Sequence, residues 1–449
     1  MHSKKRPAGL AMALALFTVA ALMTGTRAAA QEEKVLHSFA VDGAGGSDPN
    51  GGLIADAAGN LYGTTVYGGT GVCGSATPTG CGVVFELKRN ASGGWTEKVL
   101  HNFNNDGKDG FYPYAGLAFD AAGNLYGTTG YGGAGVCSSV APTGCGTVFE
   151  LMPQTGGRWA EKVLHSFGGG SDGELPEGGL ILDKGGNLYG TTAGISYNCI
   201  YSPYVDCGTV FKLTPHAGGS WTEKVLHSFN NNGADGYGPA GAVVRDASGN
   251  LYGGAYFGGA FGDGAVFELT PGGSGSWTEQ VLYSFFYKGN FGGGPGTLIL
   301  DAAGNLYGTT PTGGTTYSGA VFQLTPAGGG SWTETVLYNF DLYTTGATTS
   351  SLIFDSAGNL YGTNRFGGAG TTICYVFGGG NESASCGTAF KLSPVGGGTW
   401  SATTLHSFGN GTDGQVPYAG VIRDAAGNLY GTTSSGGTYG GGTVFEVKP

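Results

Sequence analysis

Five histidines stand at equivalent places in repeated segments, and most of them are followed by serine. They are His37, His101, His165, His227 and His406, and Tyr283 and Tyr338 take the same place in two further copies. By number the imidazoles could hold a metal, and each His-Ser pair has the residue types of a catalytic dyad. Neighbours on a strand point to opposite faces, however, and copies on different sheets are kept apart. We therefore predict that these histidines pack structurally, and we expect no metal and no cofactor.

Carboxylates recur in two motifs, and both favour turns over chemistry. In Asp-x-x-Gly-Asn the aspartate is expected to accept hydrogen bonds from its own backbone. This motif starts at Asp56, Asp120, Asp183, Asp246, Asp301, Asp355 and Asp424. The second motif, Asp-Gly-x-x-Pro, starts at Asp109, Asp172, Asp235 and Asp413. With Asn104 and Asp106, the first copy resembles an oxygen-rich calcium loop, but the other copies lack the added carboxylates. We favour a plain turn.

These motifs belong to a unit that occurs seven times, with 54 to 69 residues between successive starts. Each unit carries four short runs of β-branched and aromatic residues, bounded by Gly, Pro, Asn and Asp, as in strands and turns. In the second copy the runs, called a to d, are Gly116–Phe119, Leu125–Thr129, Thr147–Leu151 and Trp159–Phe167. The 94 glycines among 449 residues disfavour long helices, and they lack the collagen period. The pattern predicts an all-β, seven-bladed β-propeller of four-stranded antiparallel blades.

The ends of the chain predict that the ring is closed. No run d follows Glu446, whereas the segment Glu33–Phe39 is a run d without runs a, b or c. We expect this N-terminal strand to complete the C-terminal blade, so that no open sheet edge remains. An open solenoid is the alternative, but no repeat looks like a polar cap.

The units resemble the GloVer-motif tandem-repeat family. The stretches that carry the resemblance are NLYGTT at Asn124–Thr129, GTVFEL at Gly146–Leu151 and WTEKVLHSF at Trp221–Phe229. The resemblance covers essentially all of residues 33–449. It implies an exported, propeller-like protein without an assigned activity. A weaker resemblance, through the D-x-x-G-N-L-Y-G-T stretch, is to the sensor propellers of two-component regulators.

The N-terminus predicts export. Residues 1–30 combine Lys4-Lys5-Arg6, an apolar stretch from Leu10 to Met23 and a final Ala28-Ala29-Ala30, as in a secretory signal peptide. An uncleaved N-terminal anchor is the alternative. Residues 31–449 then form one domain, located in the periplasm or outside the cell. The formal charge of −11 gives no electrostatic reason to bind nucleic acid or anionic membranes, and no later segment is apolar enough to span a membrane.

The eight cysteines fall into four local pairs. These are Cys73/Cys81, Cys137/Cys145, Cys199/Cys207 and Cys374/Cys386. An even number in an exported chain favours disulfides. Zinc is the alternative, but no pair has CxxC spacing or a nearby histidine. Each bond would close a short loop and stiffen it.

In a propeller, run a lines the axis, and the d–a and b–c loops emerge together on one face. The position six residues before the repeated aspartate varies on that face. It reads Asn50, Tyr114, Glu177, Ala240, Pro295, Thr349 and Tyr418. We select Asn50, Tyr114, Glu177 and Tyr418 as ligand-binding candidates, together with Tyr67 and Tyr131 from the disulfide loops. Neutral drift of the loops and packing of the rings remain open.

Three functions fit this pattern. The first is a binding or scaffold module for an extracellular polysaccharide or an envelope protein. The second is a glycan-active enzyme, a hydrolase or lyase, that uses Glu177 on the same face. Glycoside hydrolysis needs two carboxylates, and Glu177 is the only acid among the seven varying positions. The third is a purely structural surface protein.

Overall fold

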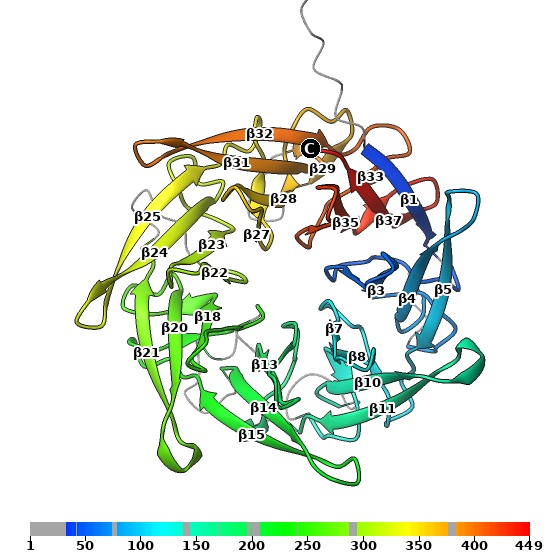
Figure 1. The fold of residues 1–449 in the computed structure, drawn as a ribbon, viewed down its shortest axis with the longest axis horizontal. Helices are drawn as coiled ribbons and strands as arrows, with labels where there is room; N and C mark the ends of the chain where they lie inside the picture. Colours follow the sequence, from blue (N-terminus) through cyan, green and yellow to red (C-terminus); the bar gives the residue numbers. More distant parts are fainter. Residues whose placement is uncertain are drawn as a thin grey trace, which may run out of the picture.

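The computed structural model describes residues 33–41, 43–73, 79–137, 144–168, 170–194, 199, 207–239, 241–286, 294–375 and 383–449. The predicted signal peptide and Ala240 lie outside these residues. Seven small sheets surround a common axis (Figure 1). The predicted seven-bladed propeller is therefore confirmed.

Blades 1 to 6 pair their four main strands in sequence order from the axis outward, and blade 7 takes its outer strand from the N-terminus. Blade 1 contains β2 (Ile54–Ala55), β3 (Leu61–Thr65), β4 (Val83–Arg89) and β5 (Trp95–Asn102). Blade 2 contains β7 (Ala118–Phe119), β8 (Leu125–Thr129), β10 (Thr147–Pro153) and β11 (Trp159–Ser166). Blade 3 contains β12 (Ile181–Leu182), β13 (Leu188–Thr192), β14 (Thr209–Pro215) and β15 (Trp221–Ser228). Blade 4 contains β17 (Val244–Arg245), β18 (Leu251–Ala255), β20 (Ala265–Pro271) and β21 (Trp277–Ser284).

The remaining blades follow the same plan. Blade 5 contains β22 (Ile299–Leu300), β23 (Leu306–Thr310), β24 (Ala320–Gly328) and β25 (Ser331–Asn339). Blade 6 contains β27 (Ile353–Phe354), β28 (Leu360–Phe366), β31 (Thr388–Gly396) and β32 (Thr399–Ser407). Blade 7 contains β34 (Ile422–Arg423), β35 (Leu429–Thr433), β37 (Gly440–Val447) and the N-terminal strand β1 (Glu33–Ala40).

The loops between these strands contain short strands and 3₁₀ turns. Paired loop strands are β6 (Gly110–Phe111) with β9 (Tyr131–Gly132), β16 (Gly236–Tyr237) with β19 (Phe257–Gly258), β33 (Gly414–Gln415) with β36 (Ser435–Gly436), and β29 (Ile373–Tyr375) with β30 (Ser383–Ser385). Strand β26 (Ala347–Thr349) pairs with β28. Three single 3₁₀ turns occur at Thr155–Gly157, Gly170–Asp172 and Gly273–Gly275.

The two ends of the chain close the ring as predicted. Strand β1 runs antiparallel to β37, with Val35 opposite Phe445 and Ser38 opposite Thr443. In Figure 1 the blue β1 lies beside the red β37 on the outer side of blade 7. The last blade is therefore built from both ends of the chain, and its outer strand comes from the N-terminal side.

The blades are held together by a repeated pair of buried phenylalanines. In each junction the phenylalanine that ends one blade's outer strand packs on that of the next blade's third strand, with ring centroids 4.8–5.2 Å apart. The pairs are Phe39–Phe85, Phe103–Phe149, Phe167–Phe211, Phe229–Phe267, Phe285–Phe322, Phe340–Phe390 and Phe408–Phe445. Such edge-on aromatic contacts add to the burial of the rings. The same contact therefore closes all seven junctions.

Small residues surround the axis because neighbouring blades approach there with their backbones. A Cβ atom on Gly116 would lie 2.7 Å from the carbonyl oxygen of Gly52, too close for any side chain. The innermost strands are also shorter than predicted, with β7 covering two of the four residues of run a. The chain before β7 contacts the neighbouring blade instead of pairing within its own sheet.

Candidate functional site

The repeated aspartates are turn residues, as predicted. In blade 1, Oδ1 of Asp56 accepts hydrogen bonds from the amides of Ala58 and Asn60, both at 2.9 Å. Its Oδ2 accepts from the Asn60 side chain at 2.7 Å and from the Tyr62 hydroxyl at 3.2 Å. The carboxylate fixes the a–b turn and has no free role in chemistry.

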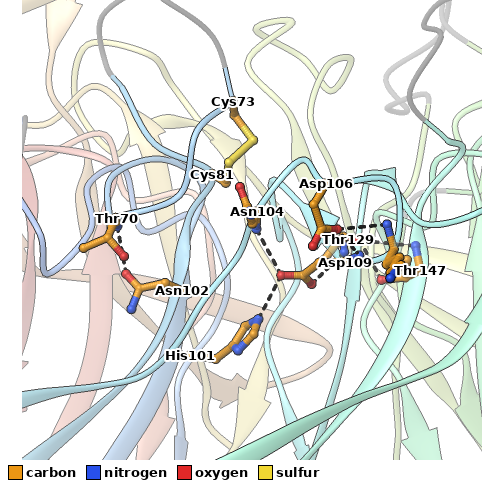
Figure 2. A network of polar contacts seen from close by, with 12 residues as sticks. Thr70, Cys73, Cys81, His101, Asn102, Asn104, Asp106, Asp109, Thr129 and Thr147 are labelled. Carbon is orange, nitrogen blue, oxygen red and sulfur yellow. Dashed lines mark hydrogen bonds and ion pairs between the residues drawn. A yellow bond between two sulfur atoms is a disulfide. The ribbon is translucent and has the colours of Figure 1, made fainter.

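The histidines lie at separate junctions, also as predicted, but each has an acidic partner. Nε2 of His101 lies 3.2 Å from Oδ2 of Asp109, which also accepts from the Asn104 amide at 3.0 Å (Figure 2). The equivalent pairs are His165–Asp172, His227–Asp235 and His406–Asp413, at 2.8–3.2 Å. The aspartate of Asp-Gly-x-x-Pro is thus a histidine partner as well as a turn residue.

The sequence held a signal for this pairing that pattern analysis missed. The two junctions where tyrosine replaces histidine, at Tyr283 and Tyr338, also lack the Asp-Gly-x-x-Pro motif. His37 lacks it too, and its Nε2 lies 3.6 Å from Oε2 of Glu97 instead. The calcium-like copy is a turn, because Asp106 accepts from the amides of Lys108 and Asp109 at 2.9 Å.

The four predicted disulfides form, with Cα–Cα distances of 5.1–5.3 Å. They indicate an oxidising compartment. No helix in the described ranges is both long and apolar enough to cross a membrane. The loop residues Tyr197, Tyr201, Tyr204 and Phe377 lie outside those ranges.

Each disulfide supports the loop that enters the next blade. The carbonyl of the second cysteine accepts a hydrogen bond from a residue just before the proline of that loop, at 2.8–3.0 Å. The pairs are Cys81 with Tyr112, Cys145 with Leu175, Cys207 with Gly238 and Cys386 with Val416. Tyr112, Leu175 and Val416 have φ between 57° and 59°, a conformation that non-glycine residues rarely adopt. Strain of this kind persists only where the surroundings enforce it.

Mild reduction is therefore expected to loosen these loops without unfolding the ring. The amides of Tyr112, Leu175 and Val416 should lose protection in hydrogen–deuterium exchange, while Val148 in the third strand of blade 2 keeps it. Asp48 provides a matched control, because its amide donates to the carbonyl of Gly441, which is not a cysteine. Global unfolding under mild reductant, or equal loosening at Asp48, would contradict this role of the disulfides.

A cavity of about 390 Å³ opens at the axis, and residues from all seven blades line it. Four of the predicted candidates lie on its wall: Asn50, Tyr114, Glu177 and Tyr418. Blades 5 and 6 contribute Thr297 and Ser351, which lie two residues after the predicted positions Pro295 and Thr349. The varying positions of blades 1, 2, 3 and 7 therefore converge on one cavity.

A second pocket, of about 360 Å³, lies between blades 7 and 1 and shares Asn50 and Tyr418 with the axial cavity. Ser47 and Asp48 line it as well. Ser47 is 2% exposed, and its Oγ, like Oδ1 of Asn50, has no hydrogen-bond partner among the described residues. Buried polar atoms of this kind are costly unless a ligand or water satisfies them. The two hollows are adjacent, because Asn50 and Tyr418 line both, and together they are called the axial site below.

Arg365 is a site residue that the sequence pattern did not single out. It directly follows Asn359–Asn364, the counterpart in blade 6 of the NLYGTT stretch, and this position differs in every copy. Its Nη2 donates to the hydroxyl of Tyr418, and its guanidinium lies 3.6 Å from the centre of the Tyr418 ring. Nε of Arg365 is buried without a partner among the described residues. The arginine therefore orients Tyr418 and keeps one donor unused.

The equivalent residue of blade 4, Tyr256, was missed for the same reason. Burial raises the pKa of the Tyr256 hydroxyl, while Arg365 lowers it and Glu177 raises it. The hydroxyl of Tyr256 in blade 4 is therefore within electrostatic reach of Arg365 in blade 6 and of Glu177 in blade 3. A large side chain directly after the six-residue stretch that corresponds to NLYGTT was the available signal.

Tyr67 and Tyr131 belong to an aromatic cluster beside the axial site. Tyr67 contacts Tyr112 edge-on at 5.1 Å, and Tyr131 stacks on Phe111 at 5.7 Å. Burial raises the pKa of Tyr114, and Tyr131 and Tyr67 raise it further, so the cluster adjoins the cavity. Both residues are half-buried and serve loop packing at least in part.

The face that carries the d–a and b–c loops also carries most of the exposed apolar surface. Among the described residues, the exposed large hydrophobic side chains other than Val395 all lie in these loops or at their ends. They are Val41, Val72, Val136, Tyr256, Phe261, Phe286, Tyr317, Tyr343, Ile373, Tyr418 and Tyr439. Exposed apolar residues gathered on one face mark interaction surfaces. The opposite face presents mainly the repeated turns.

Two half-buried carboxyl groups, those of Asp48 and Glu177, line the axial site. Burial raises the pKa of Asp48 to about 6, and burial also raises the pKa of Glu177. Sequence analysis selected Glu177 and missed Asp48, because the Asp-Pro pair at Asp48 reads as a turn. The walls of the site therefore offer two acids and the tyrosines Tyr114 and Tyr418, and Arg365 contacts Tyr418.

Comparisons with solved structures found distant likenesses. One is to the extracellular domain of a hybrid two component system from B. thetaiotaomicron, with 12% identity and a TM-score of 0.49. The match includes 93% of the present chain and 41% of that domain. Another is to a gluconolactonase from Xanthomonas campestris, with 15% identity and a TM-score of 0.39. This match includes 74% of the present chain and 86% of the gluconolactonase. No curated protein matches the chain.

Comparison with protein families identifies the family of this chain. The model of the Gloeobacter/Verrucomicrobia repeat matches residues 21–202 and again residues 201–377, which together are most of the chain. The two matches are tandem, as the seven-fold repetition of the sequence requires. This disulfide-containing β-propeller belongs to the Gloeobacter/Verrucomicrobia repeat family.

Proposed function

We propose that this chain is an exported binding module for an extracellular polysaccharide, acting in the periplasm or outside the cell. The observation that carries the proposal is the axial site. There, positions that vary between blades converge on one cavity, on a scaffold that is otherwise repetitive. Ligand sites are usually concave, with a few placed polar groups among aromatic walls. The axial site has this composition.

The chemistry of the axial site suits a sugar. Tyr418 is 38% exposed and is held by Arg365, so that little freedom is lost when a pyranose ring stacks on it. The unpartnered oxygens of Ser47 and Asn50 can accept hydrogen bonds from hydroxyl groups. Arg365 keeps the Tyr418 ring in place, because its guanidinium lies 3.6 Å from the ring centre.

An envelope protein is the second partner to consider, because the exposed apolar residues extend well beyond the axial site. A flat protein interface would use that wider rim and would depend less on Tyr418. A purely structural surface protein would use neither. The variants below separate these cases.

A glycan-active enzyme is favoured by one specific observation. Asp48 lines the hollow between blades 7 and 1, Glu177 lines the adjacent axial cavity, and burial raises the pKa of both. A carboxyl with a raised pKa can act as general acid while a second one serves as base or nucleophile. Glu177→Gln should then abolish sugar release while it leaves binding in place.

The binding proposal is tested by screening the protein on an array of bacterial polysaccharide fragments and measuring affinities for the hits. Tyr418→Ala should weaken binding about tenfold or more, as loss of an aromatic anchor usually does. Tyr343→Ala is the matched control, an exposed tyrosine of the same face that lines neither hollow. Equal affinity of the wild type and Tyr418→Ala for every hit would overturn the proposed site.

A further inference from the structure

Two of the seven junctions bring a histidine, an aspartate and a glutamate together, away from the axial site. In the first, one ligand atom each from His227, Asp235 and Glu279 lies within 4.8 Å of the other two. In the second, the same holds for His406, Asp413 and Glu33. Nitrogen and oxygen donors of these three types are ligands for zinc and related divalent ions.

The clusters arise from the repeat itself. The histidine ends the outer strand of one blade, and the aspartate follows in the d–a loop. The glutamate comes from the outer strand of the next blade: Glu279 from β21 and Glu33 from β1. Each cluster therefore spans a junction between blades.

Two other junctions, those of Asp109 and Asp172, hold the same three residue types without forming such a cluster. They differ from the compact clusters in the hydrogen bonds of the aspartate. Both oxygens of Asp109 have donors: His101 and the Asn104 amide on Oδ2, and the Gly110 amide on Oδ1. The carboxylate at these junctions is satisfied by protein groups alone, as Figure 2 shows for Asp109. Asp172 is likewise satisfied by His165 on Oδ1 and the Gly168 amide on Oδ2.

In the two compact clusters one oxygen of the aspartate is left without a donor. All three donors to Asp235, from His227 and Asn230, reach Oδ2, and Oδ1 has no partner. Oδ1 of Asp413 is also without a partner. These aspartates are only 6% and 7% exposed, so water does not readily supply the missing donor.

The glutamate of each cluster has an orphaned oxygen as well. Oε1 of Glu279 and Oε1 of Glu33 are buried and have no hydrogen-bond partner among the described residues. Two buried carboxylates that face each other without a donor repel, and either a cation or a shared proton between them relieves the repulsion. The histidine adds a neutral nitrogen ligand.

We propose that each of these two clusters binds one divalent metal ion, with zinc as the preferred ion. Two carboxylates balance the charge of the ion, and the imidazole favours zinc over calcium or magnesium, which prefer oxygen ligands alone. Three protein ligands leave a coordination position for water. The ions act structurally and lie apart from the axial site.

The second metal site would have a particular consequence for ring closure. Glu33 is in the N-terminal strand of blade 7, whereas His406 is in β32 of blade 6 and Asp413 is in the loop that follows. A metal ion there ties β1 to the neighbouring blade in addition to its pairing with β37. Metal binding should thus stabilise the closed ring.

The test uses the full chain, freed of metal with a chelator and then dialysed against ZnCl₂. Metal analysis and calorimetric titration should give two zinc ions per chain. Glu33→Gln and Glu279→Gln should each reduce this number to one, and the double variant to none. Glu161→Gln is the matched control, because it changes the same repeat position at the junction of Asp109, and it should keep two.

The melting temperature gives a second test of metal binding. Zinc should raise the melting temperature of the wild type and not that of the double variant, and calcium and magnesium should have little effect. If Glu33→Gln fails to fold, Glu279→Gln alone still tests the first site. The proposal is overturned if the wild type binds no zinc at micromolar concentrations or if Glu279→Gln binds as much as Glu161→Gln. A shared proton between Asp235 and Glu279 would then explain the cluster.

Discussion

Replacing Phe39 with alanine is expected to lower the free energy of unfolding by about 3–5 kcal/mol, the usual effect of removing a buried phenylalanine. Phe39 is 1% exposed, and its ring packs on Phe85 at 5.2 Å. It is also carried by β1, the one outer strand that reaches its blade from the other end of the chain. Loss of this contact therefore weakens both a junction and the closure of the ring.

Equilibrium unfolding in urea measures this effect, and hydrogen–deuterium exchange shows where it acts. Phe103→Ala removes the equivalent contact from blade 1, whose strands are continuous in sequence. Phe39→Ala should expose the amides of Thr443–Val447 to exchange, whereas Phe103→Ala should not. Val41→Ala, at an exposed position, should change stability by less than about 0.5 kcal/mol. Unchanged exchange in β37 of Phe39→Ala would contradict the closure.

Without bound metal, the protein is expected to be most stable near pH 5 and to lose stability as the pH rises to 8. The pKa of six outer-strand glutamates is raised from 4.5 to about 7, mainly because these side chains are partly buried. They are Glu33, Glu97, Glu161, Glu223, Glu279 and Glu334. Between pH 4.5 and 7 the folded chain binds more protons than the unfolded chain, so stability falls with rising pH. Above pH 7 this dependence levels off.

Other groups limit the stability on the acid side. The pKa of Asp56 is lowered, because hydrogen bonds from Asn60 and Tyr62 outweigh the effect of burial, and Asp355 falls to about 2 in the same way. Their contribution is lost as the pH falls below about 4. Burial lowers the pKa of His37, which also disfavours acid conditions. Since the glutamates are partly exposed, each contributes only about 1 kcal/mol.

Urea unfolding at pH 5, 6, 7 and 8 in the presence of a chelator checks this expectation. The midpoint should fall across the series, and Glu334→Gln should reduce the dependence. Asp106→Asn serves as control, because hydrogen bonds from backbone amides hold the pKa of this carboxyl low and it stays ionised throughout. A midpoint that rises between pH 5 and pH 8 would show that the outer-strand glutamates are not the buried acids described here.

The fold could be predicted from the sequence because each blade repeats the same local signals. The Asp-x-x-Gly-Asn motif predicted a turn, the runs predicted strands, and the lone run d at Glu33–Phe39 predicted closure of the ring. What the repeat could not show is how blades contact one another. The Phe39–Phe85 pair and its equivalents join residues of different units, so no spacing within one run reveals them. The histidine–aspartate pairs join a strand to the loop that follows it, and their signal was the joint absence of the histidine and of Asp-Gly-x-x-Pro in two copies.

The site was predictable only in part for a related reason. Asn50, Tyr114, Glu177 and Tyr418 share one position of the repeat, and comparison of the copies was sufficient to place them on one wall. Arg365 and Asp48 reach the same site from other positions, after run b and before the loop proline. Their convergence depends on the three-dimensional path of two loops, which the composition of neither loop determines.

The structure of the protein in complex with its tightest polysaccharide fragment tests the central claim most directly. The account predicts that a sugar ring lies against Tyr418, with hydroxyl groups bound by Asn50 and Ser47 at the mouth of the axis. A fragment bound to the opposite face, among the Asp-x-x-Gly-Asn turns, or on the outer strands would contradict it.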